Sequence, residues 1–471
     1  MKRILVTIVM SLASIGIAQE TYLGLYLQGN KLGYSVYKQS DDTLNGKQVK
    51  RNDSRTVINA GLLGTAMQME IQSVSWSDAN GRPLKMRFVT SSSGRTQTLD
   101  AVFTVSQIAL DIDNNGTASK KTIEIPSGAQ IVDDPLTPLI TGGAEVGSKK
   151  AFYVLDPTTA TLIKNEVVVK GPGTADVKGT QVSATKVEII DPRANTTVFL
   201  SRKGDLVKAE GPMGIEMIPE SKEEALGKND TGYRPSIDLA LVTSIKTDKP
   251  INDPGKLGFL KMRVSGRDLS RAPKDAHQTL SGKGESWVVT VHPPKLGDSA
   301  GLTIQQAGQS RPSWLKPSLH IPSNAPQFKS LAKQIIGTET NAKKAALKIK
   351  SYVNQKMKPN AGIGVLRDAT EVWATKEGVC RDYAILTATL MRSAGIPTRV
   401  ASGLVNWDGN FYYHAWVEIW DGKRWLGMDS TTADPQISAT HVKLADGNVE
   451  EAFTFTFLDK VKIEVMEMRR W

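Results

Sequence analysis

The feature that most constrains the fold is a succession of short segments, over the first half of the chain, in which apolar and polar residues alternate between turn residues. In residues 67–71 the apolar side chains fall on one face, Asn80-Gly81 turns the chain, and residues 84–88 alternate back. Alternation of this kind places successive side chains on opposite faces of a strand, and tight turns join antiparallel neighbours. We therefore predict one large antiparallel β-domain over residues 19–240, built either as a curved sheet or as a sandwich.

The N-terminus has a different character. Lys2 and Arg3 precede an apolar run over residues 4–18, which ends with the small residues Gly16 and Ala18 on either side of Ile17. This order is typical of a secretory signal peptide, and the run is shorter than the ~20 apolar residues that a membrane span needs. We predict that residues 1–18 are a signal peptide and that the mature protein is secreted or periplasmic. Association with the cell envelope is compatible with that compartment.

A second β-rich stretch covers residues 241–310 and is either a small domain or an extension of the first. It contains alternating segments at residues 260–264 and 287–291. Four prolines in residues 311–326 then force an extended backbone and mark a boundary. Helical spacing begins after it, with apolar residues at i, i+3, i+4, i+7 and i+8 from Phe328, and a second helix follows.

The composition excludes several classes of partner. Basic residues exceed acidic ones by 59 to 48, but the excess is spread along the chain and does not gather with aromatic residues, so we predict no nucleic-acid partner. Cys380 is the single cysteine, so no intramolecular disulfide and no cysteine-based metal site can form. Residues 111–116 begin like a calcium loop, but Thr122 stands where a bidentate glutamate is required, and we expect a hairpin turn. No metal and no cofactor are predicted.

Cys380 stands in the first turn of a predicted helix that ends at Gly395-Ile396-Pro397. The N–H groups and the positive dipole end at a helix N-terminus favour a thiolate, and an amide there can stabilise an oxyanion. A lone cysteine in such a place can also be simply the first core residue of the helix. The residues that follow decide between these interpretations.

Two strands after that helix carry a histidine and a carboxylate. His414 lies in the first predicted strand, and Asp429 ends the returning strand after a turn at Asp421-Gly422. A two-residue turn sets Trp420 opposite Lys423 and therefore His414 opposite Asp429, so that imidazole and carboxylate lie side by side. A helix packed on this face presents the cysteine to the imidazole. The carboxylate then fixes the tautomer, the imidazole takes the thiol proton, and the thiolate attacks a carbonyl.

Other residues compete with these three. Asp382 and Asp434 are alternatives to Asp429, and Asp382 is also a candidate substrate contact because it follows the nucleophile by two positions. Four histidines have no ligand spacing and are expected in the core or on the surface: His277, His292, His320 and His441. Of these, His441 can approach the site through the C-terminal segment. Four aromatic residues can wall an acyl-binding groove, although core positions are more usual for them: Trp373, Tyr383, Trp407 and Trp416.

The motif blocks resemble those of the transglutaminase-like superfamily, whose fold belongs with the papain-like cysteine proteases. The four blocks, in order, are residues 378–384, 395–399, 414–416 and 425–431. The resemblance covers about residues 321–434, and it implies a catalytic triad of Cys380, His414 and Asp429. Ser430 departs from the pattern, since proline is commoner there, but it is not a catalytic position. The β-rich region before these blocks and residues 439–444 resemble, more loosely, exported bacterial proteins that carry this domain.

We therefore predict an α+β chain with a papain-like, transglutaminase-like catalytic domain over residues 311–435, preceded by the large antiparallel β-rich region. Residues 436–471 are expected to complete the fold as a β-hairpin about residues 458–460. The predicted function is that of an exported thiol enzyme that acts on an amide or peptide bond of a protein or peptide substrate through an acyl-enzyme. Water as acceptor gives the favoured peptidase or amidase, and an amine gives a crosslinking transglutaminase. Two further alternatives are a non-catalytic envelope scaffold and a β-domain that acts as a lid over Cys380.

Overall fold

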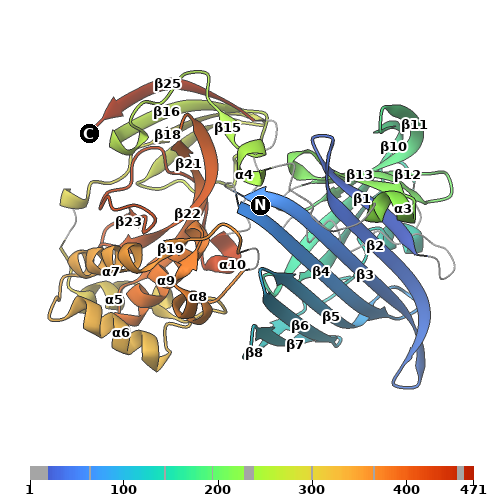
Figure 1. Cartoon of the computed structure of the whole chain (residues 1–471), viewed down its shortest axis with the longest axis horizontal. Coiled ribbons are helices and arrows are strands. Elements are labelled where there is room, and N and C mark those ends of the chain that lie inside the picture. Colours follow the sequence, from blue (N-terminus) through green and yellow to red (C-terminus); the bar gives the residue numbers. More distant parts are fainter. Residues whose placement is uncertain are drawn as a thin grey trace. The chain divides into compact units, whose positions relative to one another are not determined.

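The computed structural model of the chain describes residues 20–62, 65–142, 145–193, 195–227, 238–298, 301–363, 366–452 and 461–471 (Figure 1). The chain divides into two compact units. The first runs to Val242 and includes residues 362–366, and the second comprises residues 243–361 and 367–471. The predicted signal peptide lies outside the described residues. Within the described ranges, every helix is too short or too polar to cross a membrane.

The first unit contains one continuous antiparallel sheet of fourteen strands. Its spatial order is β8 to β1 followed by β14 to β9, so two meanders meet where β1 (Thr21–Leu27) pairs with β14 (Ile215–Glu220). The first meander continues through β2 (Asn30–Leu44), β3 (Lys47–Leu62), β4 (Thr65–Ser77), β5 (Pro83–Ser92), β6 (Arg95–Phe103), β7 (Gln107–Asn114) and β8 (Thr117–Glu124). The second comprises β9 (Lys149–Asp156), β10 (Thr161–Val177), β11 (Thr180–Ile190), β12 (Thr196–Leu200), β13 (Leu206–Glu210) and β14. Among the described residues of this unit there are also the short helices α2 (Thr137–Gly142), α3 (Lys222–Leu226) and α4 (Leu239–Val242).

Turn chemistry explains why neighbours in sequence are neighbours in this sheet. Asn115 and Gly116, between β7 and β8, both have positive φ angles, of 51° and 92°, as a two-residue hairpin turn requires. Asp113 Oδ1 accepts from the Gly116 N–H at 2.8 Å. The segment that begins like a calcium loop is therefore a hairpin turn, as the sequence predicts.

The sheet of the first unit is curved, and it is not split into the two sheets of a sandwich. Its order places β8 and β9 at opposite edges, yet Lys121 Nζ on β8 donates to the carbonyl of Ala160, in the turn after β9, at 2.8 Å. The predicted alternation holds along β4 and β5, where Met69, Ile71 and Phe88 are buried. The sheet thus curls until its two edge strands approach each other.

The second unit holds a five-stranded antiparallel sheet with helices. The spatial order is β15-β22-β21-β24, and β23 also pairs with β22. The strands are β15 (Ile245–Lys246), β21 (Thr398–Trp407), β22 (Asn410–Trp420), β23 (Trp425–Met428) and β24 (Val442–Gly447). The helices are α5 (Ile304–Ser310), α6 (Pro326–Ile336), α7 (Ala342–Lys356), α8 (Ala369–Thr375), α9 (Cys380–Ser393) and α10 (Val449–Ala452). Helix α9 contacts β21, β22 and the three preceding helices, which makes it the centre of the unit (Figure 1).

The helices follow the apolar spacing of the sequence. Pro326 is at the start of α6, where its missing N–H is not needed, and Phe328 and Ala332 are buried. In α7 the buried side chains include those of Ala345, Ile349 and Val353, spaced as a core-facing stripe. Helix α9 is buried along almost its whole length.

A smaller sheet of the second unit unites distant parts of the chain. Its order is β17-β18-β16-β25, with β16 (Leu257–Ser265), β17 (Gln278–Lys283), β18 (Ser286–Val291) and β25 (Lys462–Arg470). A two-stranded parallel pair, β19 (Lys358–Pro359) and β20 (Glu377–Gly378), leads into α9. In the C-terminal segment, β24 pairs with β21 and β25 with β16, while the turn and first strand of the predicted hairpin lie at residues 453–460, outside the described residues.

Candidate active site

Cys380 is the first residue of α9, and the residue is partly exposed. Val379, the residue before it, is the N-cap of this helix. The N–H groups of Asp382 and Tyr383 donate to the carbonyl of Val379 at 2.8 and 3.2 Å and form the first helical turn. The Val379 N–H in turn donates to Asp382 Oδ2 at 2.9 Å. The thiol therefore stands at a well-formed helix N-terminus, where N–H groups have no acceptor within the helix.

A buried ion pair holds that N-terminus in place. Arg367 is fully buried, and its Nε donates to Asp382 Oδ1 at 3.2 Å, while its other nitrogens donate to Thr375 Oγ1 and to the carbonyl of Glu377. A Cβ added at Gly378 would lie 2.5 Å from the Cβ of Asp382, so only glycine fits against this pair. Asp382 is 0% exposed. The interpretation of Asp382 as a substrate contact is therefore wrong, because its carboxylate is used inside the protein.

His414 lies in a part of β22 that pairs on one side only among the described strands. β15 pairs with residues 410 and 411 at one end of this edge, and β23 pairs with residues 417–420 at the other. Cys380 approaches between them, and its thiol is hydrogen-bonded to the His414 side chain and to the backbone N–H of Ala415. The edge of the sheet thus brings the imidazole and the cysteine together.

Asp429 completes this line of contacts from the end of β23. His414 Nε2 lies 2.8 Å from Asp429 Oδ2, and because a carboxylate only accepts, the imidazole donates. Oδ1 accepts from the N–H and the hydroxyl of Thr431 at 2.9 and 2.7 Å. The structure therefore brings all three predicted triad residues together, while Asp434, the other alternative, is exposed.

The predicted strand register was wrong by two residues. Trp420 pairs with Trp425, not with Lys423, and pairing stops at Val417 and Met428. The side chain of Asp421 accepts from the N–H groups of residues 423 and 424, both at 2.9 Å, and this makes a four-residue loop out of the expected two-residue turn. The contact with His414 survives because Asp429 lies beyond the paired strand and turns back toward it.

Residues 430–432, just after β23, are held by hydrogen bonds from two helices, α7 and α9. Lys350 Nζ on α7 donates to the carbonyl of Thr432 at 2.5 Å, and Asn354 Nδ2 donates to the carbonyl of Ser430 at 3.0 Å. The hydroxyls of Thr387 on α9 and Ser430 are 2.8 Å apart. These supports were not predicted from the sequence. The available signal in the sequence was a lysine beside the apolar stripe of α7, Lys350. In the structure this residue is only 2% exposed.

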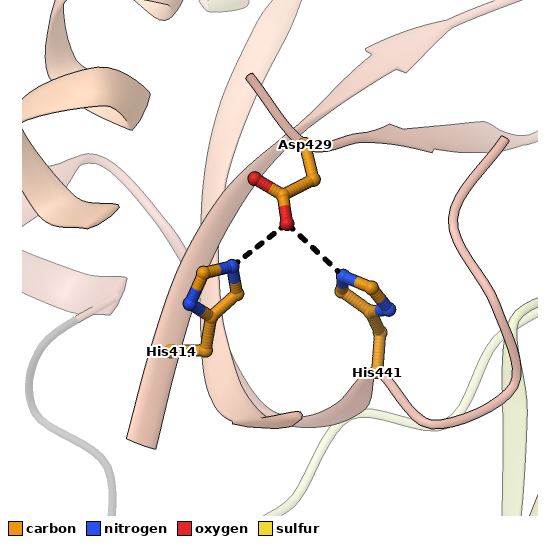
Figure 2. A group of neighbouring side chains, drawn as sticks. All are labelled: His414, Asp429 and His441. Atoms are coloured by element: carbon orange, nitrogen blue, oxygen red, sulfur yellow. Dashed lines mark hydrogen bonds and ion pairs between the residues drawn. The ribbon is translucent and has the colours of Figure 1, made fainter. Parts of the chain in front are cut away.

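His441 also reaches the site, immediately before β24. Its Nε2 lies 3.3 Å from the same oxygen of Asp429 that His414 contacts, and Figure 2 shows both rings directed at that atom. Trp416 lies against both rings, with centroids 6.4 Å from His414 and 5.2 Å from His441. The route through the C-terminal segment that the sequence left open for His441 is the one that the structure takes.

The other candidates occupy core or surface positions. His277 and His320 are buried, and His292 is exposed. Tyr383 and Trp416 are buried, as is usual for aromatic residues at a helix–sheet junction. Trp407 is 63% exposed in the β21–β22 hairpin, with its ring 6.1 Å from that of Tyr412, and Trp373 lies 6.1 Å from the ring of Tyr352 on α7.

The charges of the site support one another. Burial raises the pKa of the Cys380 thiol, but the hydrogen bond and charge of His414 outweigh it, so the net shift is downward. Burial lowers the pKa of His414, but Asp429 and Cys380 raise it to about 10. Burial raises the pKa of Asp429, yet His414 and then His441 hold it well below its usual range. These directions favour a thiolate, an imidazolium and a carboxylate in a row near neutral pH.

Two groups of side chains in the described residues have donor atoms close enough to hold a metal. In the first, the donors of His414, Asp429 and His441 lie within 4.8 Å of one another, but hydrogen bonds already join them. In the second, the carboxylates of Asp275, Glu418 and Asp446 meet similarly. The ammonium of Lys443 contacts all three of these carboxylates, so it fills the place that a cation would take. The absence of a metal stays a prediction.

Comparison with known proteins gives a match over the residues that form the site. A sequence model of the Transglutaminase-like superfamily matches residues 329–430. An uncharacterized protein of Mycobacterium tuberculosis is 24% identical in an alignment of 181 residues, which covers 33% of this chain and 57% of that protein. The chain therefore spans little more than half the length of such curated relatives. A protein-glutamine gamma-glutamyltransferase of Pseudomonas aeruginosa is 40% identical over 68 residues, 12% of this chain and 10% of that protein.

Among solved structures, a candidate cysteine protease from Cytophaga hutchinsonii is similar over 45% of this chain and 86% of its own. The sequence identity is 17% and the TM-score is 0.33. A score of this size does not establish a shared fold.

Proposed function

The chain belongs, through residues 329–430, to the transglutaminase-like superfamily, a family of thiol enzymes, and on this premise we propose that it cleaves or transfers acyl groups at amide or peptide bonds. The observation that carries the proposal is the line of contacts from Cys380 through His414 to Asp429. A helix that presents its first residue to an antiparallel sheet also supports the papain-like fold for this part of the chain.

The proposed chemistry follows from the different roles of the two ring nitrogens of His414. His414 uses Nε2 for Asp429, so Nδ1 is the nitrogen that exchanges a proton with the Cys380 thiol. The thiolate forms a C–S bond to the substrate carbonyl, and the helix N-terminus stabilises the oxyanion. His414 then gives its proton to the leaving amine as the C–N bond breaks, which leaves an acyl-enzyme. An incoming acceptor gives a proton to His414, attacks the thioester and releases the thiolate.

With water as the acceptor the enzyme is a peptidase or amidase, and this is the activity that we favour. With an amine it is a crosslinking transferase. A specific observation supports this second candidate, since the Pseudomonas relative at 40% identity over 68 residues is a protein-glutamine gamma-glutamyltransferase. Both activities use a protein or peptide substrate. The proposal extends to export, with residues 1–18 as a signal peptide that is removed.

The first test is alkylation of Cys380 by iodoacetamide, followed by mass spectrometry across about pH 4 to 9. An activated thiolate reacts well below the free-thiol pKa of ~8.5, and His414→Ala should abolish this reactivity at low pH. The matched control is His292→Ala, which removes an exposed histidine and should leave the rate unchanged. Alkylation that follows ordinary thiol ionisation and ignores His414 contradicts the proposal.

Turnover then separates the enzyme from a scaffold. Incubation with a peptide pool, with and without an amine donor, should yield cleaved or amine-linked peptides from the wild type and none from Cys380→Ser. Rapid alkylation with no turnover of any peptide favours the non-catalytic scaffold. The lid alternative predicts faster alkylation once the first unit is removed. The cut belongs after Val242, because β16, β17 and β18 pair within the second unit and a cut at residue 310 would remove them.

A further inference from the structure

The proposed triad leaves one buried histidine of the site without a role. His441 directs Nε2 at Asp429 Oδ2 from 3.3 Å, and His414 Nε2 lies 2.8 Å from the same atom (Figure 2). Because a carboxylate only accepts, His441 must carry a proton on Nε2 in this arrangement. Its side chain is 8% exposed and that of Asp429 is 4% exposed, so water has little access to replace this donor.

We propose that His441 is a positioning residue of the thiol site, whose Nε2–H group holds Asp429 Oδ2 toward His414. Its effect on the thiol rests on the proposed function. The hydrogen bond itself acts on Asp429 and can be tested in a protein without any turnover.

The position of Asp429 explains why a second donor is needed. Strand pairing stops at Met428, so no backbone ladder fixes the residue that follows. Thr431 supplies two hydrogen bonds to Oδ1, and the two imidazoles share Oδ2. Without His441, Asp429 Oδ2 keeps only one of its two imidazole donors, His414. The carboxylate is then held toward the sheet only by the ring that must also exchange a proton with the thiol.

His441 is itself held firmly. Its carbonyl accepts from His277 Nε2 at 2.6 Å, its N–H donates to the carbonyl of Ser438 at 3.2 Å, and its ring stands at 88° to that of Trp416. Burial lowers the pKa of His277 to about 4, so this ring is neutral and its Nε2–H is a permanent donor to the carbonyl. The His277 N–H donates in turn to Asp275 Oδ1 at 2.9 Å. The second imidazole is thus tied into the interior of the unit.

The charged groups around Asp429 determine which measurable property the loss of His441 should change. The groups that act on it are His414 on β22, His441, Lys350 on α7 and Cys380 on α9. Burial raises the pKa of Asp429, and His414 and His441 lower it. Loss of the His441 donor should therefore raise the pKa of Asp429. A carboxylate that is no longer held toward His414 also stabilises the imidazolium less well, so the thiol should ionise at higher pH and the acid limb of its reactivity should move upward.

Two substitutions separate donation from packing. His441→Phe keeps an aromatic ring against Trp416 but has no donor, whereas His441→Gln loses the ring but retains an N–H group of similar reach. We expect His441→Phe to slow alkylation of Cys380 at neutral pH by roughly tenfold, the size of one hydrogen bond to a charged group, and to shift the acid limb upward. His441→Gln should keep most of the wild-type rate and profile. His292→Gln is the control for loss of a histidine outside the site.

The opposite ranking, with His441→Phe like the wild type and His441→Gln slow, means a packing role and overturns the inference. Equal slowing in both overturns it as well. His441→Leu replaces the phenylalanine variant if thermal unfolding shows that the larger ring is not tolerated. A carbon-13 NMR titration of Asp429 in a Cys380→Ser background tests the inference without the thiol. A higher Asp429 pKa in the phenylalanine variant than in the glutamine variant supports it, even if alkylation of the wild type ignores His414.

Discussion

Two charged groups flank Trp416 on β22 and have opposite characters. On one side His414 leads to Asp429, His441 and the thiol of Cys380. On the other side Glu418, which is 0% exposed, belongs to an ion-pair cluster of three carboxylates and two cations: Asp275, Arg399, Glu418, Lys443 and Asp446. In the ion-pair cluster each charged group lies against an opposite charge. The line of proposed triad residues ends instead at Cys380, a residue that is partly exposed.

The contrast shows how one strand can serve both stability and chemistry. Arg399 Nε and Lys443 Nζ contact Glu418 at 2.7 and 2.9 Å, and they hold its pKa below the usual range although burial raises it. A buried charge of this kind is tolerable only while its partners remain. The proposed triad needs the reverse condition, because its thiolate must be able to leave the imidazolium and attack a substrate. We therefore expect mutations in the triad to affect activity and mutations in the ion-pair cluster to affect stability.

The largest expected effect is on activity. His414→Ala removes the group that takes and returns the proton, so turnover or, failing a known substrate, alkylation at neutral pH should fall by roughly 10²- to 10⁴-fold. The unfolding midpoint should fall less than it does for a loss in the ion-pair cluster, because Asp429 keeps the hydrogen bonds from Thr431 and His441. A variant that keeps its rate but unfolds far more easily would reverse the assignment of the two groups.

The ion-pair cluster should give the opposite result. Glu418→Ala leaves Lys443 and Arg399 buried with fewer opposite charges, and it should lower the free energy of unfolding by about 3–5 kcal/mol. Urea unfolding followed by fluorescence measures this. Glu467→Ala is the control, because Glu467 pairs with Arg469 on the exposed edge strand β25 and should cost less than about 1 kcal/mol. Similar losses from the buried and the exposed glutamate would mean that the ion-pair cluster does not stabilise the unit.

A substitution at the start of the cysteine helix should reduce both activity and stability moderately. In Gly378→Ala the new Cβ would lie 2.5 Å from Asp382 Cβ and 2.7 Å from Arg367 Nη2, so the N-terminus of α9 must shift. Overpacking of this kind costs about 1–3 kcal/mol, and alkylation of Cys380 should slow with it. Gly297→Ala is the control, since nothing lies within 4 Å of its Cβ position and its φ is outside the left-handed region. Wild-type alkylation in Gly378→Ala would show that the thiol tolerates movement of its helix.

The smallest effect is a change in how stability depends on pH. The pKa of His414 is raised to about 10 and that of Cys380 is lowered, so once the thiol has ionised the folded pair holds one proton, on His414. The window to compare runs from about pH 6.5 to 8.5, between the ordinary pKa values of an imidazole and a thiol. The unfolded chain also holds one proton in this pH window, on the thiol. The pair therefore adds no pH dependence to the free energy of unfolding. In Cys380→Ser the folded protein still holds the His414 proton but the unfolded chain holds none, so stability should fall as pH rises through this window. Urea unfolding at several pH values compares the wild type with Cys380→Ser. If the free energies of unfolding of both proteins change with pH in the same way, the raised pKa of His414 is contradicted.

Local chemistry made much of this structure predictable. The hairpin turns and apolar alternation predict the strands of the first unit, and the motif order predicts three residues that the structure brings together, Cys380, His414 and Asp429. The register between β22 and β23 was not predictable from the same rules, because the Asp421 side chain lengthens the loop through two hydrogen bonds to backbone N–H groups. A turn with an aspartate in its first position can close in either way, and only the surrounding structure selects one.

The supports of the site were predictable only in part, since the sequence allowed His441 to approach the site but did not indicate its contact with Asp429 or any role for Lys350. Lys350 and His441 reach Asp429 or the loop after it from segments far apart in the chain, and each contacts it through one side-chain atom. No spacing within either segment specifies such a contact. Tertiary packing decides it, whereas the N-cap of α8 at Asp368, which accepts from the N–H groups of residues 370 and 371, is fixed by its own neighbours.

The order of strands in the first unit has a consequence for how the chain reaches its fold. Every other described pairing in the fourteen-stranded sheet joins strands that are consecutive in sequence, whereas Leu27 on β1 pairs with Ile215 on β14. Each meander can thus assemble from hairpins on its own, and the sheet is completed by one late docking event that closes a very long loop. Until then β1 is an open edge with buried-type residues such as Leu23 and Leu25, a surface on which two unfinished chains can pair with each other.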